Sequence, residues 1–581
     1  MIGPIKYILS RIITDVVADI ALSRSIELPE KLRNKIEYPP DLKMGHYSSP
    51  VAMELASIFR EKPFLIATQI KEGLLKNDEL KQIISNIEIA GPGFLNFYVS
   101  EFYHTLILEG SIINISDLNI KVENPRKIIF EFVSANPTGP LNTVSARAAA
   151  IGDSICNVLE RAGNEVFREY YVNDYGNQVY LLGLSFAYRY LQLKGYDVIL
   201  PEECYQGEYI IDVLNKIIKD NGDISKSIAV ELESSEKIEK SCQELGLYFA
   251  PLAIQYLVET QKSDLHKFRV DFNNFFSEKS LHESGEVMIT KDILEKKNKV
   301  YLKEEALHFR STDYGDNKDR VIVRSDGRPT YLLADIAYHH TKVTRGFDTI
   351  YNIWGPDHHG YIARLSGAMQ ALGFGVENSD QEFKVLIVQQ VNMIEDGKSV
   401  VMSKRLGKFH TMADLLDKIP VDVIRYFFLM RSQSAHLDFD LDLALTHSSK
   451  NPVYYIQYAY ARIRSIFREV GLDFKTPVPV GKIDHSLYSC ESRSVLLVQL
   501  WRYNEVVNEI AKNLEIHHLP EYLHNVATLF TAFYHDKENN IIQTLKEDQQ
   551  RGRVLLRIIQ LCAAVISDGL SLLGIDSPEK M

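Results

Sequence analysis

The sequence lacks several features that would place it in a special class of protein. It has no uninterrupted run of about eighteen apolar residues, so we expect no membrane-spanning helix. Its five cysteines lie far apart without a Cys-x-x-Cys pair, which excludes a zinc knuckle or a disulfide framework and fits a reducing cytoplasm. An excess of basic residues is also missing, because the net charge is −12. That charge argues weakly against a nucleic-acid partner but leaves room for a local basic face.

The chain has the length and composition of an ordinary multidomain globular protein. Its 581 residues predict three or four domains, and 45% hydrophobic with 24% charged residues is typical of such proteins. The first twenty residues carry Lys6, Arg11 and Asp15 within an apolar stretch. This pattern predicts an amphipathic helix rather than a signal peptide.

The first third of the chain changes pattern near residue 117. The preceding part predicts a small α/β unit, with a helix capped by Ser49 and two short strands on either side of Gly91-Pro92-Gly93. After it, KIIFEFV (127–133) predicts a buried parallel strand, followed by a helix from about Thr143 to Ala162 and a second strand, EVFREYYV. These elements predict a βαβ unit with a right-handed connection.

The rest of the chain predicts an insertion, a second α/β half and a helical bundle. Residues 180–300 are mostly helical in pattern and separate the two halves of a sheet. DTIYNIW (348–354) and FKVLIVQQV (383–391) predict two further strands, and the segment after the second strand predicts a polar loop. From about Val421 onward, apolar stripes at helical spacing predict a bundle.

The turn after the first buried strand is the first candidate site. A helix begins there at Asn142 or Thr143, and the N-terminus of a helix favours an anion through its unpaired N–H groups and its dipole. Asn142, Thr143 and Ser145 add neutral donors, so a phosphate site is one interpretation. The alternative is that Asn142 or Thr143 only caps the helix, and from this turn alone the cap is the more common case.

A basic loop in the second half is the other candidate site. VMSKRLGKF carries Lys404, Arg405 and Lys408 after the final strand of that half. Nucleotidyl transfer needs positioned cations to stabilise charge on the departing pyrophosphate. A basic loop alone is usually a solvated surface, but one that faces a helix N-terminus in a split α/β sheet predicts a nucleotide-activating site.

These two segments resemble the two signatures of class I aminoacyl-tRNA synthetases. The first is ANPTGPLNTVSARAAAIGD and the second is VMSKR. The flanking text resembles arginyl-tRNA synthetases over almost the whole chain. The similar stretches include FEFVSANPTGPL, REYYVNDYGNQV, SDGRPTYLLADIAYH, WGPDHHGYIARL, MSKRLGKFHTMADLLD, LDFDLDLA and NPVYYIQYAYARI.

The resemblance implies an α/β plus all-α architecture with three domains. A small N-terminal α/β domain (1–115) would contact the tRNA elbow. A Rossmann-type parallel sheet (116–420), split by an insertion at about 180–300, would carry catalysis. A helical domain (421–581) would bind the anticodon.

The resemblance also implies an activity. The enzyme would activate arginine with ATP and transfer it to tRNA(Arg), giving arginyl-tRNA, AMP and pyrophosphate, and it would need bound tRNA for the first step. Mg²⁺ is expected with the ATP substrate, without a tightly bound metal. We further expect a cytoplasmic monomer that has no membrane partner.

Residue roles follow from the matched motifs. Asp335 would hold the guanidinium of arginine with paired charge-assisted hydrogen bonds, which lysine cannot form because it lacks the planar fork. The arginine-binding candidates are Glu131, Ser134, Asn136, Tyr331, Asp335 and His358. The ATP-binding candidates are Asn142, Val144, Ser145, Gly355, Asp357, His358, Met402, Ser403, Lys404 and Phe409. The catalytic candidates are Asn142, Ser145 and Lys404.

Aromatic and basic residues at the start of the bundle are candidates for contact with tRNA. Tyr454, Tyr458 and Arg462 have the side chains that stack on unpaired bases or meet the backbone. For each tyrosine, packing in the core is an equally good interpretation. The later basic residues Arg551, Arg553 and Arg557 are expected on a solvated helix face.

The first signature departs from the family pattern. Its two expected histidines are replaced by Asn142 and Ser145, its glycine by Val144, and the first lysine of the second signature by Val401. Neutral donors in place of charged ones weaken each hydrogen bond, by about 1 kcal/mol. We therefore expect a working enzyme in which Asn142, Ser145 and Lys404 serve the phosphates. The alternative is a tRNA-binding paralogue impaired in catalysis.

Overall fold

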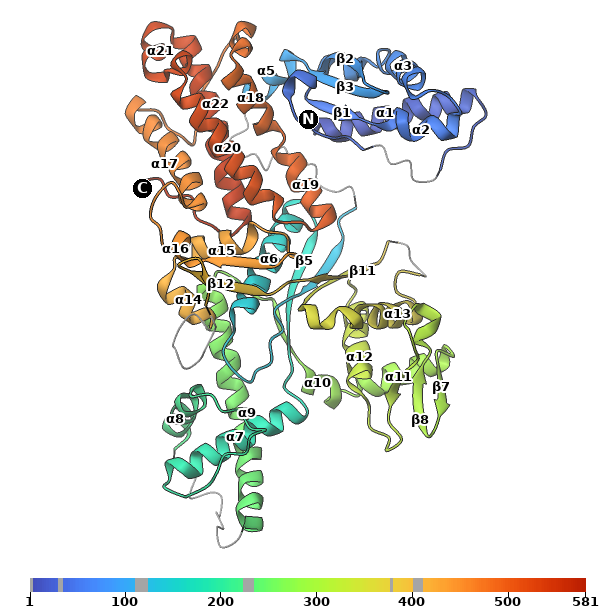
Figure 1. Cartoon of the computed structure of the whole chain (residues 1–581), viewed down its shortest axis with the longest axis vertical. Coiled ribbons are helices and arrows are strands. Elements are labelled where there is room, and N and C mark those ends of the chain that lie inside the picture. The colour runs from blue at the N-terminus through green and yellow to red at the C-terminus, as the bar shows by residue number, and fades with distance from the viewer. Residues whose placement is uncertain (1–3, 30–34, 110–123, 223–234, 377–379, 401–410) are drawn as a thin grey trace. The chain divides into compact units, whose positions relative to one another are not determined.

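The computed structural model describes residues 4–29, 35–109, 124–222, 235–376, 380–400 and 411–581. Figure 1 shows the elements of the chain. The chain divides into two compact units, and each is described here by itself. One combines Met1–Val122 with Thr446–Met581, and the other is Glu123–Leu445.

The N-terminal part of the first unit is a small α/β structure, as predicted. A three-stranded antiparallel sheet in the order β1-β3-β2 packs against the amphipathic first helix. Its elements are α1 (Ile5–Ser23), β1 (Tyr47–Ser49), α2 (Val51–Phe59), α3 (Pro63–Leu74), α4 (Asp78–Ile83), β2 (Ile84–Ala90), β3 (Phe94–Val99) and α5 (Glu101–Glu109). The predicted cap of α2 was wrong by one residue: Pro50 is the N-cap, and the Ser49 hydroxyl accepts from Val51 N–H over 3.3 Å.

The C-terminal part of the first unit is the predicted helical bundle. Its helices are α17 (Pro452–Val470), α18 (Glu491–Trp501), α19 (Tyr503–Asn513), α20 (His518–His535), α21 (Ile541–Glu547) and α22 (Gln549–Leu572). By length and composition, α22 alone among the helices described could cross a membrane, but 78% of its most apolar window is buried in the bundle. The prediction of a solvated Arg557 was wrong, because this side chain is fully buried and donates to Leu108 O over 3.2 Å.

A buried carboxylate links the two parts of the first unit. Glu505 of α19 is 4% exposed and accepts hydrogen bonds from Lys6 N–H at 2.8 Å, Tyr38 OH at 2.8 Å and Tyr47 OH at 2.9 Å. Burial raises the pKa of Glu505 in spite of these donors. The guanidinium of Arg502 lies 4.2 Å from the centre of the Tyr38 ring.

The second unit is built on a five-stranded parallel sheet, which confirms the predicted fold class. The strand order is β11-β10-β4-β5-β6. These strands are β4 (Lys127–Glu131), β5 (Glu165–Val172), β6 (Asn274–Ser277), β10 (Thr349–Trp354) and β11 (Glu382–Ile387). The chain order reverses between β4 and β10, so the carboxyl ends of these two strands border the crevice where such sheets bind ligands.

Helix α6 (Thr143–Arg161) follows β4 and confirms the predicted βαβ unit. Gly152 brings it close to the strand, because a Cβ at this position would lie 2.4 Å from the Phe132 ring. Arg147, also on α6, is fully buried and donates to three backbone oxygens, Gln389 O, Ser432 O and Ala435 O, over 2.9–3.0 Å. These bonds fix the start of α6 to the segment after β11, at Gln389, and to a second segment at Ser432 and Ala435.

The segment predicted as an insertion contains more than helices. It includes α7 (Asn177–Leu193), α8 (Tyr209–Asn221), α9 (Ser235–Lys267), β6, α10 (Glu278–Glu283) and α11 (Glu286–Lys296). Strand β6 belongs to the main sheet, which the sequence analysis missed because the strand is only four residues long. A small antiparallel sheet follows, formed by β7 (Val300–Lys303), β8 (Ala306–Phe309) and β9 (Arg320–Val323). The helices α12 (Tyr331–Thr344) and α13 (Ile362–Leu372) come next in this unit.

One prediction near the end of the second unit was wrong. The segment predicted as a polar loop contains β12 (Val391–Glu395) and β13 (Lys398–Ser399). The region predicted as nearly all helix after Val421 is mostly helical, and it also contains β14 (Leu437–Asp440), which pairs parallel to β12. Strands β12 and β14 are short and pair across 46 positions, as Asn392 does with Asp438. The helices α14 (Met412–Lys418), α15 (Val421–Leu429) and α16 (Leu441–Ala444) complete this unit.

Candidate active site

The backbone turns sharply where β4 ends. Val133 and Ser134 both have positive φ angles, 68° and 41°, which is uncommon for any residue and strained for a β-branched one. The Ser134 hydroxyl compensates by donating to Glu131 Oε1 over 3.0 Å and accepting from Tyr171 N–H over 3.1 Å. The turn therefore brings Glu131 and Ser134, two arginine-binding candidates, together at the carboxyl edge of the sheet.

The loop beyond this turn is held by the insertion. Gln261 of α9 is 1% exposed and donates to Asn136 O over 3.2 Å and to Gly139 O over 2.8 Å. The Tyr209 hydroxyl of α8 donates to Thr138 O. Two prolines leave this loop few donors of its own, so contacts from the insertion helices position Asn136 and the approach to α6.

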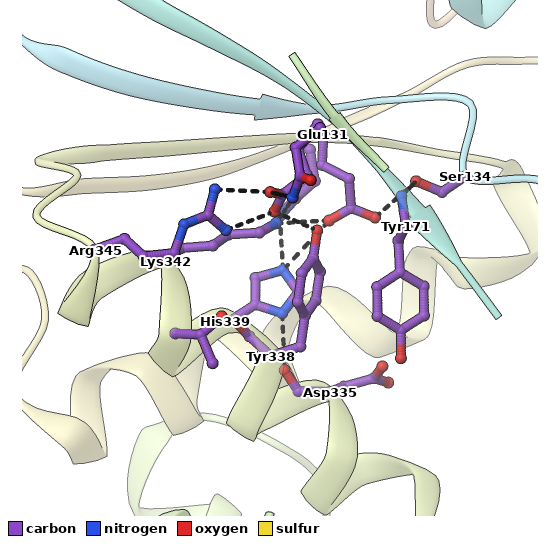
Figure 2. Close-up of polar contacts among 12 residues, drawn as sticks. Glu131, Ser134, Tyr171, Asp335, Tyr338, His339, Lys342 and Arg345 are labelled. Atoms are coloured by element: carbon purple, nitrogen blue, oxygen red, sulfur yellow. Dashed lines mark hydrogen bonds and ion pairs between the residues drawn. The ribbon is translucent and has the colours of Figure 1, made fainter. Parts of the chain in front are cut away.

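A buried ion pair lies below the turn. Lys342 Nζ of α12 is fully buried, 2.6 Å from Glu131 Oε2 and 3.0 Å from Asn352 Oδ1. His339 contacts the same Asn352, with Nε2 3.2 Å from Nδ2. Burial and the Lys342 charge hold the pKa of His339 well below its ordinary value, so this ring is neutral. Figure 2 shows Lys342 and His339 turned toward Glu131 from α12.

This ion pair changes the interpretation of Glu131. Both of its carboxylate oxygens have partners from the protein itself, Ser134 and Lys342. The carboxylate is thus fixed at the sheet edge and its charge is balanced. Its proposed contact with arginine stays a prediction.

Asp335 lies one helical turn before His339 on α12. Tyr361 donates to Asp335 Oδ2 over 2.5 Å, and Asp335 O contacts His339 Nδ1 at 2.9 Å. Burial, and then the charge of Glu131, raise the pKa of Asp335 to about 6, while the Tyr361 hydrogen bond and Lys342 act in the opposite direction. Tyr331, on the same face four residues earlier, is 62% exposed.

A second buried carboxylate, which the sequence analysis missed, accompanies Asp335. Glu278 is 4% exposed and comes directly after β6 at the same edge of the sheet. Burial raises its pKa to about 7; the Asp335 charge adds to the shift, and the hydrogen bond from Tyr171 opposes it. Recognition of β6 as a strand would have placed Glu278 beside the other candidates.

Asp335 and Glu278 form an acidic pair at this edge of the sheet, because the charge of Asp335 acts on Glu278 and both pKa values are raised. A group that carries positive charge and several donors would relieve their repulsion and satisfy their oxygens. Nearby in the sequence, Gly176 has a φ of 88°, and a Cβ placed there would lie 3.6 Å from the Tyr331 hydroxyl. The arrangement suits a planar, multidentate cation such as a guanidinium.

The start of α6 is capped by Asn142. Its Oδ1 accepts from Ser145 N–H over 2.8 Å, so the capping interpretation of this residue is confirmed. The cap uses the side-chain oxygen as an acceptor, and Nδ2 is the donor group of this exposed side chain. Val144 and Ser145 are half-buried in the first turn.

The backbone beyond the second signature contacts the start of α6. Residues 401–410 are outside the described part of the chain, and with them the second signature and the candidates Met402, Ser403, Lys404 and Phe409. The first described residues after them are close to α6. Asn142 forms an antiparallel bridge with Thr411, and Met412 N–H donates to Leu141 O over 2.8 Å. The start of α6 and the segment from Thr411 onward are therefore joined by backbone contacts.

The remaining ATP candidates follow β10. Gly355 precedes a short 3₁₀ helix, η5 (Pro356–Tyr361). Asp357 and His358 are exposed on it, and the His358 ring lies 6.1 Å from that of Trp354. These residues lie at the carboxyl end of the strand that borders the crevice beside β4.

The candidate tRNA contacts lie on α17 in the first unit. Tyr458 is 55% exposed, whereas Tyr454 is half-buried and stacks on His447 with ring centres 5.3 Å apart. The Arg462 guanidinium lies 4.8 Å from the centre of the Tyr534 ring and donates to its hydroxyl. Tyr458 is thus the tyrosine of this pair that is not packed in the core.

The fold and the edge of the sheet that carries these residues are those of a class I aminoacyl-tRNA synthetase. Residues 109–422 match the model of the class I (R) tRNA synthetase catalytic domain. Residues 7–99 match the arginyl tRNA synthetase N terminal domain, and residues 456–581 match the DALR anticodon binding domain. The chain belongs to the arginyl-tRNA synthetase family.

Individual relatives agree with this assignment. The chain is 44% identical to an arginine--tRNA ligase of Leptospira interrogans over 95% of its own length and 94% of the relative. It is 39% identical to an arginine--tRNA ligase of Geobacillus kaustophilus over the full length of both. A putative arginyl-tRNA synthetase of Campylobacter jejuni superposes with a TM-score of 0.70, 33% identity and coverage of 83% of this chain and 100% of that chain. Thermus thermophilus arginyl-tRNA synthetase shares the fold at a TM-score of 0.76 and 20% identity, over 99% of this chain and 100% of that chain.

Proposed function

We propose that the protein activates arginine with ATP and transfers the arginyl group to tRNA(Arg), releasing pyrophosphate and AMP. The observation that carries this proposal is the pair of carboxylates Asp335 and Glu278 at the carboxyl edge of a class I synthetase sheet, which in this proposal line an acidic pocket. The proposal agrees with the ligase activity that the names of the relatives state.

In this proposal the acidic pocket recognises the side chain of arginine. The guanidinium lies between Asp335 and Glu278, with Tyr331 at the exposed side. Asn136, fixed through its backbone by Gln261, faces the α-amino or carboxyl end of the substrate. His358 borders the same substrate, and Glu131 and Ser134 shape the floor. Lysine would place one point charge between two carboxylates and leave acceptors unpaired, which disfavours it.

ATP in this proposal lies between the start of α6 and the residues after β10. Asn142 and Ser145 donate to phosphate oxygens while the helix dipole favours their charge. Gly355, Asp357 and His358 border the ribose, and Val144, Met402, Ser403 and Phe409 border the adenine side. Lys404 stabilises the charge that develops on the departing pyrophosphate. Mg²⁺ accompanies ATP as part of the substrate.

The proposed setting is that of a cytoplasmic, monomeric translation enzyme. The N-terminal domain (1–115) contacts the tRNA elbow, and the helical domain (421–581) binds the anticodon, with Tyr454, Tyr458 and Arg462 as contacts. The exposed Tyr458 suits stacking on an unpaired base.

No observation on the described residues favours the alternative of an impaired paralogue. A non-catalytic descendant has no need to keep the buried Glu278 and the half-buried Asp335, because the raised pKa of each means that its charged form disfavours the folded state. In this chain both are present, while the departures from the family pattern lie in the two signatures, at Asn142, Val144, Ser145 and Val401. The working enzyme therefore remains the better interpretation.

Arginine-dependent exchange between ATP and labelled pyrophosphate tests the proposal. We expect exchange with tRNA(Arg) present and little without it. Tight tRNA binding with no exchange under either condition would instead support the paralogue. A matched measurement with lysine in place of arginine should give exchange at least about a hundredfold slower.

A further inference from the structure

The arginine pocket is supported from behind by a chain of side chains that leads away from the substrate. It starts at Asp335, whose Oδ2 accepts the Tyr361 hydroxyl over 2.5 Å. The Tyr361 ring lies 5.0 Å from the guanidinium of Arg364, one turn into α13. Arg364 Nε in turn lies 3.4 Å from Asp316 Oδ2, and Asp316 is held by Arg320 through two contacts of 2.8 Å.

Each link of this chain has a physical reason. A phenol donating to a carboxylate forms a short charge-assisted hydrogen bond, which fixes one oxygen of the acceptor. A guanidinium over a tyrosine ring attracts the ring and fixes its orientation. Asp316 is ionised, because its hydrogen bonds with Arg320 hold the pKa far below the ordinary range. It therefore anchors Arg364 at any physiological pH.

The backbone permits this support through one close approach. Gly367 of α13 faces η4 (Ser311–Tyr314), and a Cβ at Gly367 would lie 2.6 Å from Tyr314 Cβ. Helix α13 thus packs tightly on the segment that leads to Asp316. The small antiparallel sheet, through Arg320 at the start of β9, becomes the outer anchor of the pocket.

We propose that Tyr361 is a positioning residue that sets arginine affinity and specificity by fixing the Asp335 carboxylate, and that Arg364 and Asp316 hold Tyr361 in place. This inference rests on the proposed function. With Oδ2 held by Tyr361, the other oxygen and its lone pairs keep one orientation toward the guanidinium. The phenol also favours the charged form of the carboxylate that a cation requires.

The groups that face Asp335 make the effect depend on pH. The charges of Glu131 on β4 and Lys342 on α12 shift the pKa of Asp335, and the hydrogen bond from Tyr361 of η5 shifts it as well. Glu278, beside Tyr171, is the other acid of the pocket. Because Tyr361 lowers the pKa of Asp335, its loss raises that pKa and moves the acidic limb of arginine binding toward neutral pH.

The test is Tyr361→Phe in the full-length enzyme, with exchange measured over pH 5.5 to 8.5 in the presence of tRNA. We expect the KM for arginine to rise about tenfold at pH 7, as for one lost charge-assisted hydrogen bond. The KM for ATP and kcat should stay near wild type, and the acidic limb of KM for arginine should move to higher pH. Direct binding of labelled arginine gives a second readout that needs no turnover.

Tyr301→Phe is the matched control. The Tyr301 hydroxyl donates to Asp319 Oδ2 over 3.0 Å in the same small sheet, with no contact to Asp335 among the described bonds. This variant should leave both the KM for arginine and its pH profile unchanged. An equal effect in the two variants would mean that general loosening of the sheet, and not Tyr361, controls affinity.

Arg364→Met tests the outer link. Alone it should raise the KM for arginine about threefold, and added to Tyr361→Phe it should add little, because both act through one hydrogen bond. A Tyr361→Phe enzyme with wild-type KM and pH profile would overturn the inference while the proposed function stands. A wild-type protein that neither binds arginine nor supports exchange would overturn both.

Discussion

Lys342 and Glu131 form an ion pair whose closest atoms are 2.6 Å apart, and the lysine side chain is entirely buried. The pair joins α12 to the end of β4 directly beneath the strained turn at Val133 and Ser134. Asn352 supplies a further acceptor to the ammonium group. The pair therefore holds together the helix and the strand that carry the arginine-binding candidates.

Removal of the lysine should destabilise the second unit strongly. Lys342→Met leaves Glu131 charged and buried, which costs about 3–5 kcal/mol, and Glu131→Gln added to it should recover most of the loss. Urea unfolding followed by circular dichroism measures both. Lys81→Met is the control, because its pair with Asp78 is exposed and should contribute under about 0.5 kcal/mol. Equal costs for the two lysines would contradict the role of burial.

The acidic pocket should make stability and arginine binding respond oppositely to pH. The folded state raises the pKa of Asp335 to about 6 and that of Glu278 to about 7, so it binds protons more tightly than the unfolded chain. Stability without ligand therefore falls as pH rises from about 4 to 7, and the penalty is complete above pH 7. Arginine binding needs both carboxylates ionised and should strengthen over the same range.

Asp335→Asn and Glu278→Gln test this relationship. Each should raise the melting temperature at pH 8 by about 2–6 °C, change it little at pH 4, and abolish measurable arginine binding at pH 8. Thermal melts at both pH values and equilibrium dialysis of arginine provide the comparison. A variant that binds arginine normally would remove that carboxylate from the pocket.

Asn142→Asp separates the capping role from the proposed phosphate role. Aspartate keeps the acceptor for Ser145 N–H and suits the helix dipole, so stability should be unchanged or slightly higher. Its charge would repel the phosphates and should cut exchange at least tenfold. Asn77→Asp is the control, since Asn77 caps α4 in the same way with no role in the proposed site. Full activity of Asn142→Asp would place the phosphates elsewhere.

Lys404→Ala should reduce turnover far more than affinity. The proposed ammonium acts on charge that develops as pyrophosphate departs, so kcat for exchange should fall by at least about a hundredfold, with the KM for arginine and tRNA binding nearly unchanged. Lys398→Ala, an exposed lysine of β13, should have no effect. Turnover near wild type for Lys404→Ala would rule out the role given to this loop.

Sequence patterns predicted secondary-structure elements correctly where the element was long and its hydrophobic period was clear. The strand KIIFEFV, helix α6 and the strand EVFREYYV are where the patterns predict them, because buried strands and amphipathic helices carry strong local signals. Strands β6, β12 and β14 were missed. They have four or five residues each, and their partners are distant in sequence, so no local pattern distinguishes them from loops.

The same limit applies to the candidate site. Asp335 was accessible through the resemblance of its motif, YLLAD, to the family, and α12 confirms that Tyr331 and Asp335 lie one turn apart on a helix. Glu278 and Tyr361 were not, since their importance comes from burial and from contact with residues on other elements. These contacts between distant residues form only when the folded sheet brings the ends of its strands together.

The contact of Leu141 and Asn142 with Thr411 and Met412 uses main-chain atoms only. Main-chain pairing does not depend on which side chains are attached. Histidines and a glycine can thus be exchanged for asparagine, serine and valine around it while the start of α6 and the segment from Thr411 keep their mutual register. The residues of the first signature can therefore change in evolution while the backbone contact between these two segments is retained.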